Sequence, residues 1–516
     1  MMLNKKRLIT SSCLALIAVV LTVPSVSAHG FGERYDLPVP LDYFVVGAAA
    51  TVGLSFLIIA LFIRKGKQEY EYPYLNIIFG VFIYRTYKTV GGLLGLLGVF
   101  LLTATILSGL FGTEDALDNF APTFVWIIWW VGIGYAVALL GNVWLILNPW
   151  LVIFGWIERI FGSSNKPILT WKKQWDAWPA LAIFLCFAWI ENAYPGASSP
   201  KSLSVLILLY SFVTFSGMTI FGKHIWLRNG DPFSVLFSLF SRFSPTEIRV
   251  KADDQQHIIC RGCSSDCESN SDLPDCVDCY ECWTRSRSEH RQFNLRPWAT
   301  GLCRGERVTP ALVAFHLTAL ASVTFDGFSE TPAWVAVQTS LWPVVDPLPG
   351  PAVATFNSFG TFLFPLLFGL LYVQICGYVS KLSKGEMSKN SVVLSFVFSL
   401  VPIALAYNLS HYLSFLLITG QQIIPLISDP LGVGWDLLGT ADFKPNIAII
   451  NARIAWIVSI ISLVSGHVMS VYIAHVISLR RTSSHKIAIR SQYPMLALMV
   501  FYTGVSLWII AQPIVE

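Results

Sequence analysis

The chain has 516 residues, of which 54% are hydrophobic and only 13% are charged. A soluble domain carries roughly 25% charged residues, so this composition excludes a soluble fold, and the small net charge of +4 gives no support for a nucleic-acid partner. Apolar stretches of about 20 residues recur without alternating polar and apolar positions. We therefore predict an all-α polytopic membrane protein with about ten transmembrane helices, surrounded by the lipid bilayer.

The N-terminus has the pattern of a secretory signal peptide. Lys5, Lys6 and Arg7 precede an apolar stretch, and small residues lead up to Ala28. We expect residues 1–28 to be removed, the alternative being an uncleaved first helix. Cleavage would make His29 the first residue, and its amine and ring nitrogen form a chelate of the kind that suits copper. The plainer interpretation is that His29 merely follows the cleavage site.

Ten apolar stretches follow in two groups of five. In an N-terminal membrane half (29–222) we predict helices over residues 41–63, 90–112, 123–147, 178–194 and 202–222. In a C-terminal membrane half (309–516) we predict helices over residues 310–328, 355–379, 392–417, 447–479 and 493–511. Lys and Arg gather on one side of this topology, which places that side, with the loop 223–308, in the cytoplasm. Both mature termini are then outside, and the expected location is a bacterial-type inner membrane.

The cytoplasmic loop contains six cysteines within a short stretch: Cys260, Cys263, Cys267, Cys276, Cys279 and Cys282. Cysteines two residues apart place two sulfurs on one ion with little strain, so zinc is the expected occupant and an iron–sulfur cluster the second. The reducing compartment argues against disulfides, which would become the default if the topology were inverted. We predict an accessory module held together by metal.

Ionisable and amide side chains inside apolar helices are costly and are candidates for function. One set of them projects toward the outer face: Glu191, Asn192, Asp326, Asn408, His411, Asn451 and Arg453. If the helices converge, these groups form an outward-facing pocket that holds a divalent metal or relays protons. The alternative places them at headgroup depth, solvated or paired with lipid. Three histidines, His316, His467 and His475, lie deeper.

Three segments of the sequence carry a family resemblance. They are His-Gly-Phe-Gly-Glu-Arg-Tyr-Asp-Leu-Pro-Val-Pro-Leu at 29–41, the stretch from Trp129-Trp130 through Gly141-Asn142 to Asn148-Pro149-Trp150, and Asn-Leu-Ser-His-Tyr-Leu-Ser-Phe at 408–415. Together they resemble a bacterial multi-pass membrane family labelled fenitrothion hydrolase. The resemblance covers most of the membrane part and leaves out the cysteine-rich insert.

What the resemblance implies is a phosphoric triester hydrolase that acts on a lipophilic organophosphorus compound. Such a reaction generally uses a Lewis-acid metal to polarise the phosphoryl oxygen and to activate water. The side chains we nominate as catalytic are His411, Asp326 and Glu191, with His29 as a further candidate.

Two other functions stay open. A copper or other metal and proton transporter requires polar groups at intervals through the bilayer, which His316, His467 and His475 supply. A membrane scaffold would use the zinc-stapled loop to dock a cytoplasmic partner. The hydrolase is the first expectation because the resemblance favours it.

Overall fold

The structure is a computed structural model that describes residues 40–64, 72–77, 80–162, 167–251, 275–303, 308–348 and 350–512. The expected signal peptide, His29, and the cysteines Cys260, Cys263 and Cys267 lie outside these ranges. In the described part, nine helices are long and apolar enough to cross a membrane, and the strands form one small sheet. The chain is therefore an all-α multi-pass membrane protein, as the composition predicts.

The N-terminal half consists of helices whose first turns are set by proline and by capping side chains. Asn148, Ser199 and Asp231 accept hydrogen bonds from backbone N–H groups three residues further on, and each precedes a proline, the residue best suited to a first helical position. The elements are α2 (Leu41–Phe62), α3 (Gly80–Phe111), α4 (Phe120–Thr123), the π-helix η1 (Phe124–Gly132), α5 (Ile133–Leu140), α6 (Trp144–Leu147), α7 (Pro149–Phe161), α8 (Trp178–Ala193), α9 (Pro200–Phe221), α10 (Lys223–Asn229) and α11 (Pro232–Ser241).

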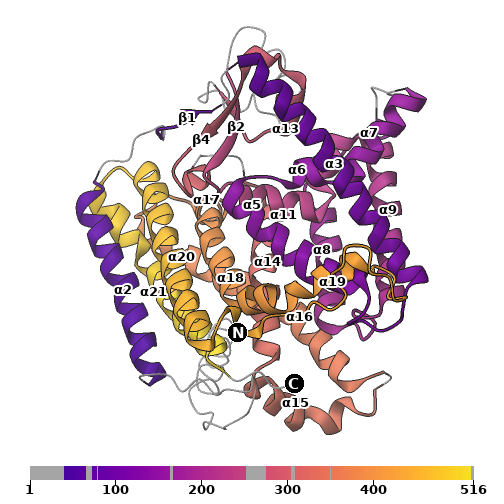
Figure 1. Cartoon of the computed structure of the whole chain (residues 1–516). Coiled ribbons are helices and arrows are strands. Elements are labelled where there is room, and N and C mark those ends of the chain that lie inside the picture. The colour runs from indigo at the N-terminus through magenta and orange to yellow at the C-terminus, as the bar shows by residue number, and fades with distance from the viewer. Residues whose placement is uncertain are drawn as a thin grey trace.

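The C-terminal half contributes five long helical segments and shorter connecting helices. The elements are α14 (Pro310–Ser329), α15 (Pro332–Val345), α16 (Ala352–Leu382), α17 (Lys389–Phe396), η5 (Val397–Leu400), α18 (Val401–Ile418), η6 (Thr419–Gln422), α19 (Ile423–Ser428), η7 (Ile447–Ile449), α20 (Ala452–Arg481) and α21 (His485–Ile510). Helix α18 packs along α20, where Gly466 leaves no room for a side chain, because a Cβ there would lie 2.5 Å from that of Ala406. Helices α2 and α21 complete this side of the bundle (Figure 1).

All ten predicted spans are helical, but one of them is short. Helix α8 has 16 residues and covers about 24 Å at 1.5 Å per residue, less than the roughly 30 Å of a bilayer core. The described residues therefore contain nine helices long enough to span a membrane, in line with the predicted number of about ten, and α8 is a shorter apolar helix. Its residues Ala180, Phe184 and Ala188 are buried in the bundle.

The first part of the predicted cytoplasmic loop is packed into the helical core. Every residue of α11 except Ser238 is buried, and Phe233 lies against Trp129 with ring centroids 4.6 Å apart. Phe237 contacts Trp144 in the same way, at 5.5 Å. A ten-residue helix is too short to be recognised as a membrane segment from its sequence. The boundary expected at residue 223 therefore falls inside the packed bundle.

A small antiparallel sheet lies at one end of the bundle, opposite the end that carries α15 (Figure 1). Its strands are β1 (Leu75–Asn76), β2 (Thr246–Val250), β3 (Cys276–Val277) and β4 (Arg291–Leu295), in the order β1-β4-β2-β3. Leu75 pairs with Leu295, so a strand from before α3 joins strands of the predicted insert. The helix α13 (Tyr280–Arg285) and the turns η3 (Ser288–His290) and η4 (Thr300–Cys303) complete this region.

A buried ion network joins the sheet to the helices. The Arg296 guanidinium, which is fully buried, donates to Asp278 at 2.8 Å and to Glu247 at 3.3 Å. It also donates to the backbone carbonyls of Ser241 and Ser244, just after α11. Because its charge is paired and its N–H groups have acceptors, this arginine can hold two carboxylates away from water.

Candidate functional site: an acid–histidine cluster in the bundle

Three side chains predicted from the sequence come together inside the bundle. Glu191 lies near the end of α8, Asp326 lies near the end of α14, and His411 lies on α18. Helix α14 leads from the sheet region to α15, so the site lies toward the end of the bundle away from the sheet (Figure 1). We call these three residues, with Tyr412 and Trp130, the acid–histidine cluster.

One carboxylate oxygen is the centre of the cluster. Asp326 Oδ2 lies 3.0 Å from His411 Nε2 and accepts a hydrogen bond from the Tyr412 hydroxyl at 2.5 Å. The same hydroxyl lies 3.4 Å from Glu191 Oε1, which also accepts the indole N–H of Trp130 at 2.6 Å. The side chains of Asp326 and His411 retain 20% and 15% exposure. Tyr412 therefore stands between two acids, and solvent-sized molecules can reach one of them.

The charges of this cluster are incompletely balanced. Among the described residues, no lysine or arginine pairs with Glu191 or Asp326, whose partners are Trp130, Tyr412 and His411. A single histidine can neutralise one carboxylate at most. In a low-dielectric interior an unpaired charge is expensive, so acids in this position are candidates for function.

Two members of the cluster, Trp130 and Tyr412, were not among the predicted site residues. Trp130 lies on the π-helix η1, and π-helical turns are frequent at functional sites. Its spacing alone resembles that of the many tryptophans at membrane interfaces. Tyr412 follows His411 directly, which turns it about 100° around the helix, and both still reach Asp326. The sequence does contain one signal for Tyr412: it lies four residues after Asn408 and therefore on the same helix face.

The remaining predicted pocket residues are distributed differently. Asn192 donates to the Ala188 carbonyl, and its own side-chain oxygen is buried without a partner. Asn451 caps the start of α20 by accepting from Ile454 N–H, and Arg453 is exposed nearby. Neither Asn451 nor Arg453 contacts the cluster within the described residues. A shared membrane depth therefore did not imply a shared site.

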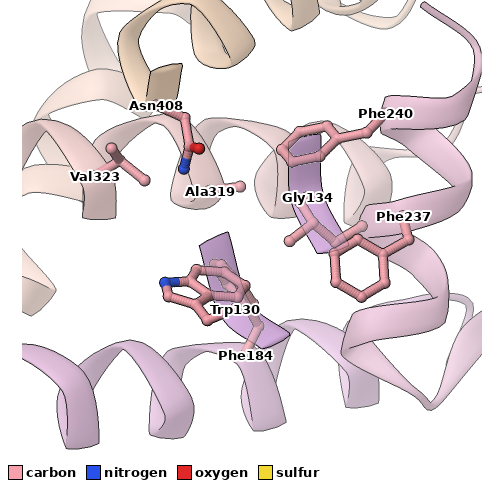
Figure 2. Close-up of a pocket in the computed structure, with 9 residues that line it drawn as sticks. Trp130, Gly134, Phe184, Phe237, Phe240, Ala319, Val323 and Asn408 are labelled. Atoms are coloured by element: carbon pink, nitrogen blue, oxygen red, sulfur yellow. The ribbon is translucent and has the colours of Figure 1, made fainter. Parts of the chain in front are cut away.

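Asn408 faces a small internal pocket beside Trp130 (Figure 2). The pocket has a volume of about 10 Å³, at the lower limit of the space that one water molecule needs. Phe184, Phe237 and Phe240 form its apolar wall, and the Asn408 amide is its polar group besides the indole. The Asn408 backbone carbonyl also accepts from the Tyr135 hydroxyl at 2.9 Å. This pocket can hold water but is far below the size of an aryl phosphotriester.

The three deeper histidines lie apart from one another. His316 and His467 each place Nδ1 on the carbonyl four residues earlier, and each leaves a buried Nε2 without a partner. His475 lies nearer the sheet end, where Nε2 is 2.9 Å from the Ile63 carbonyl and Nδ1 faces Gln492. Polar groups therefore occur at several depths, as the transport hypothesis requires.

A second candidate site lies beside the sheet. Cys276, Cys279 and Cys282 bring their Sγ atoms within 4.8 Å of one another, close enough to hold one metal ion. Arg228 on α10 donates to Cys279 Sγ at 3.4 Å. Within the described residues, this cysteine cluster is the one place where three ligand atoms meet so closely. Glu191, Asp326 and His411 do not bring their ligand atoms together in this way.

Cys303 lies nearby in sequence but does not join the cysteine cluster. Burial raises the pKa of the Cys303 thiol to about 12, so it stays protonated at neutral pH. Metal ligands are thiolates, which a buried thiol of this kind does not provide.

Comparisons with models of known protein families, with curated proteins and with solved structures found no match. The class of protein therefore follows from the fold and the site: a multi-pass helical membrane protein with an intramembrane acid–histidine cluster and a separate cysteine cluster.

Proposed function

We propose that this chain is a proton-coupled membrane transporter and that the acid–histidine cluster is its proton-binding site. The observation that carries the proposal is that Glu191 and Asp326 converge on one hydroxyl, Tyr412. Among the described residues His411 is their only basic partner, and Glu330 is a third acid that acts on Asp326 and His411. Carboxylates and histidines inside a membrane bundle are typical of proton relays in pumps and transporters. His467 and His475 lie deeper in the bundle. Polar groups at several depths support a transporter rather than an enzyme whose site is confined to one membrane face.

Protonation of the cluster can be measured without knowing the cargo. Infrared difference spectra of the purified protein, recorded as the pH changes, report the carbonyl stretch of a protonated carboxylic acid. We expect such a band in the wild type and its loss in Glu191→Gln or Asp326→Asn. Asp42→Asn, at an exposed residue near the start of α2, is the matched control and should leave the band unchanged. A wild type without a titrating carboxyl band would contradict the proposal.

Transport itself is tested in vesicles. Reconstituted protein with a pH-sensitive dye inside should take up protons when a potassium diffusion potential makes the interior negative. We expect Asp326→Asn to reduce the uptake to that of vesicles without protein, and Asp42→Asn to keep it. Uptake that is equal in the wild type and Asp326→Asn would contradict the assignment of this site.

The second candidate function is the metal-assisted triester hydrolase. The His411–Asp326 pair supports it, because a histidine oriented by a carboxylate is a common general base and its 3.0 Å contact is within hydrogen-bonding reach. Glu191, Asp326 and His411 would hold the divalent metal, for which their ligand atoms would have to move closer together than they lie in the structure. Release of nitrophenol from an aryl phosphotriester, dependent on added zinc and lost in His411→Ala, would favour this candidate over transport.

For the cysteine cluster we propose zinc. In a tetrahedral site with Zn–S bonds of about 2.3 Å the sulfurs lie about 3.8 Å apart, which the observed spacing allows. In a [4Fe–4S] cluster each cysteine binds a different iron, which separates the sulfurs further. The hydrogen bond from Arg228 to Cys279 suits a thiolate.

The zinc proposal is tested by metal analysis of the purified chain. Mass spectrometry should find zinc, and Cys282→Ser or the replacement of all six clustered cysteines should remove it. Cys186→Ser, at an exposed cysteine on α8, should retain the metal. Iron in place of zinc would contradict the proposal. The copper chelate at His29 stays a prediction, for which the same measurement on His29→Ala is the test.

We further propose that the protein lies in a bacterial-type inner membrane with the sheet end in the cytoplasm. Basic residues at the ends of α10, α16 and α20 support this orientation: Arg228, Lys381, Arg480 and Arg481. In intact cells a membrane-impermeant thiol reagent should label Asp429→Cys, after α19, and spare Glu289→Cys, beside β4. Labelling in the reverse pattern would contradict this orientation.

A further inference from the structure

A line of aromatic and imidazole rings leads from the acid–histidine cluster into the bundle. Tyr407 stacks on His411 with ring centroids 6.3 Å apart, and Tyr502 on α21 follows at 6.4 Å from Tyr407. His467 lies 6.0 Å beyond Tyr502. Since His467 is in the middle of α20, this line runs from the cluster to about half the depth of that helix.

Two polar atoms along this line are buried and lack partners among the described residues. Tyr407 and His467 are fully buried, yet the Tyr407 hydroxyl and His467 Nε2 make no hydrogen bond within the described residues. The Tyr502 hydroxyl lies 2.6 Å from Thr324 Oγ1, whose own proton goes to the Leu320 carbonyl. Tyr502 therefore donates to Thr324, and the Ser506 hydroxyl also lies close to the Tyr502 oxygen. Buried polar groups of this kind are normally satisfied by ordered water.

A glycine provides the space where the line begins. A Cβ at Gly327 would lie 2.7 Å from the Tyr407 hydroxyl and 3.3 Å from His411 Nδ1. Both atoms therefore face the same notch, which a methyl group would fill. His411 uses its other nitrogen, Nε2, for Asp326, so the two ring nitrogens connect the carboxylate to the notch.

We propose that His467 is a second proton-accepting group, reached from His411 through the Gly327 notch, Tyr407 and Tyr502 with intervening water. A proton on Asp326 passes to His411 Nε2 while His411 Nδ1 releases one to the notch, so the net charge of the imidazole is unchanged. The Tyr407 hydroxyl accepts a proton on one side and releases its own on the other. The Tyr502 O–H turns away from Thr324 to do the same. The transfer ends on His467 Nε2, and His467 becomes an imidazolium because Nδ1 keeps its proton for the Leu463 carbonyl. This inference rests on the proposed function, because Asp326 must exchange protons for the route to be used.

The structure contains a matched control for His467. His316 is also buried, also directs Nδ1 to the carbonyl four residues earlier, and also has an unpartnered Nε2. Its ring neighbour is Phe398, at 5.7 Å, which has no hydroxyl. The two histidines therefore differ in the presence of a hydroxyl route rather than in burial.

The test is deuterium exchange at the ring C2 position of each histidine, measured by mass spectrometry on the full-length protein in lipid nanodiscs. Because exchange requires protonation and access of water, we expect His467 to exchange at least about tenfold faster than His316. Tyr407→Phe should slow His467 to the rate of His316, and Gly327→Ala should do the same. The double variant Gly327→Ala/Tyr407→Phe keeps the test valid if the methyl group added by Gly327→Ala displaces Tyr407.

The outcomes separate this inference from the proposed function. Equal rates for His467 and His316 in the wild type would overturn the route, even with a titrating carboxyl band present. Fast exchange at His467 that persists in Tyr407→Phe would also overturn it. Fast exchange that needs Tyr407, in a protein without a titrating carboxyl band, would support the route while the proposed function fails.

Discussion

The ion network beside the sheet and the acid–histidine cluster in the bundle both bury carboxylates, but they give them different partners. Glu247 and Asp278 share the permanently charged Arg296. Glu191 and Asp326 share a neutral hydroxyl and one histidine. A guanidinium stays charged at every physiological pH, whereas a hydroxyl and an imidazole can exchange protons. The first arrangement suits a structural role and the second suits chemistry.

The largest effect is expected when the shared cation is removed. Arg296→Met leaves Glu247 and Asp278 buried without it, and breaking a buried pair in this way costs about 3–5 kcal/mol. Thermal unfolding in detergent measures the loss. Arg287→Met, at a side chain that is 65% exposed, is the control and should leave the transition unchanged. Equal transitions for the two variants would show that the network contributes nothing to stability.

The next effect is a pH dependence that comes from Glu247. Burial alone raises the pKa of this carboxyl, but hydrogen bonds from Asn294 and Tyr72 and the charge of Arg249 outweigh it, and the pKa stays below its ordinary value. A lowered folded-state pKa means that the ionised form stabilises the fold at neutral pH, and that this stabilisation is lost as the pH falls through the folded-state value. The difference in unfolding temperature between the wild type and Glu247→Gln should therefore narrow in acid. A gap that widens in acid would contradict this assignment.

Within the acid–histidine cluster the Tyr412 hydroxyl can be removed without changing the shape of the ring. Tyr412→Phe takes one hydrogen-bond donor from two partly buried acids, which keep His411 and Trp130 as partners. A hydrogen bond to a charged group contributes about 1.5–3 kcal/mol. Both the unfolding temperature and the pH of the carboxyl infrared band should change. Tyr372→Phe, which loses one bond to the Val393 carbonyl, is the control and should leave the band in place. A band unchanged in Tyr412→Phe would exclude the hydroxyl from the proton-binding site.

The smallest effect is expected at a half-exposed ion pair. Lys223 and Glu158 lie 2.6 Å apart with side chains that are 29% and 25% exposed. Such pairs are screened by solvent, so Lys223→Met should cost less than about 1 kcal/mol. The unfolding temperatures of the wild type and Lys223→Met at low and high salt measure this cost. A loss as large as that of Arg296→Met would remove the distinction between buried and exposed pairs.

The sequence predicted the helical membrane fold and the three acid–histidine residues for the same physical reason. Long apolar stretches can only be helices in a bilayer, and an ionisable residue within one of them stands out because it is costly. Glu191, Asp326 and His411 are such residues, and the structure brings them together. The role assigned to them stays a proposal.

The rotation of each helix about its axis and the choice of its neighbours in the bundle could not be predicted from the sequence. Asn451 and Arg453 lie at the expected level along α20 but outside the cluster, because the positive-inside rule fixes depth and not which helices are neighbours. The sequence could not indicate Tyr412 because its direction depends on how α18 packs against α14 and η1. Helix α11 was placed in the cytoplasm because ten residues are too few to predict a membrane segment, although its apolar side chains are buried among tryptophans.

The pairing of β1 with β4 has a consequence for how the chain is made. Leu75 and Asn76 find their strand partners only at Leu295 and Asn294, after the whole N-terminal membrane half and α11 have been synthesised. Until then the backbone groups of β1 must remain solvated, and the sheet cannot close. The ribosome therefore has to deliver four spanning helices and the shorter α8 before β1 can be built into the sheet. The sheet closes only when the first half of the bundle has been made.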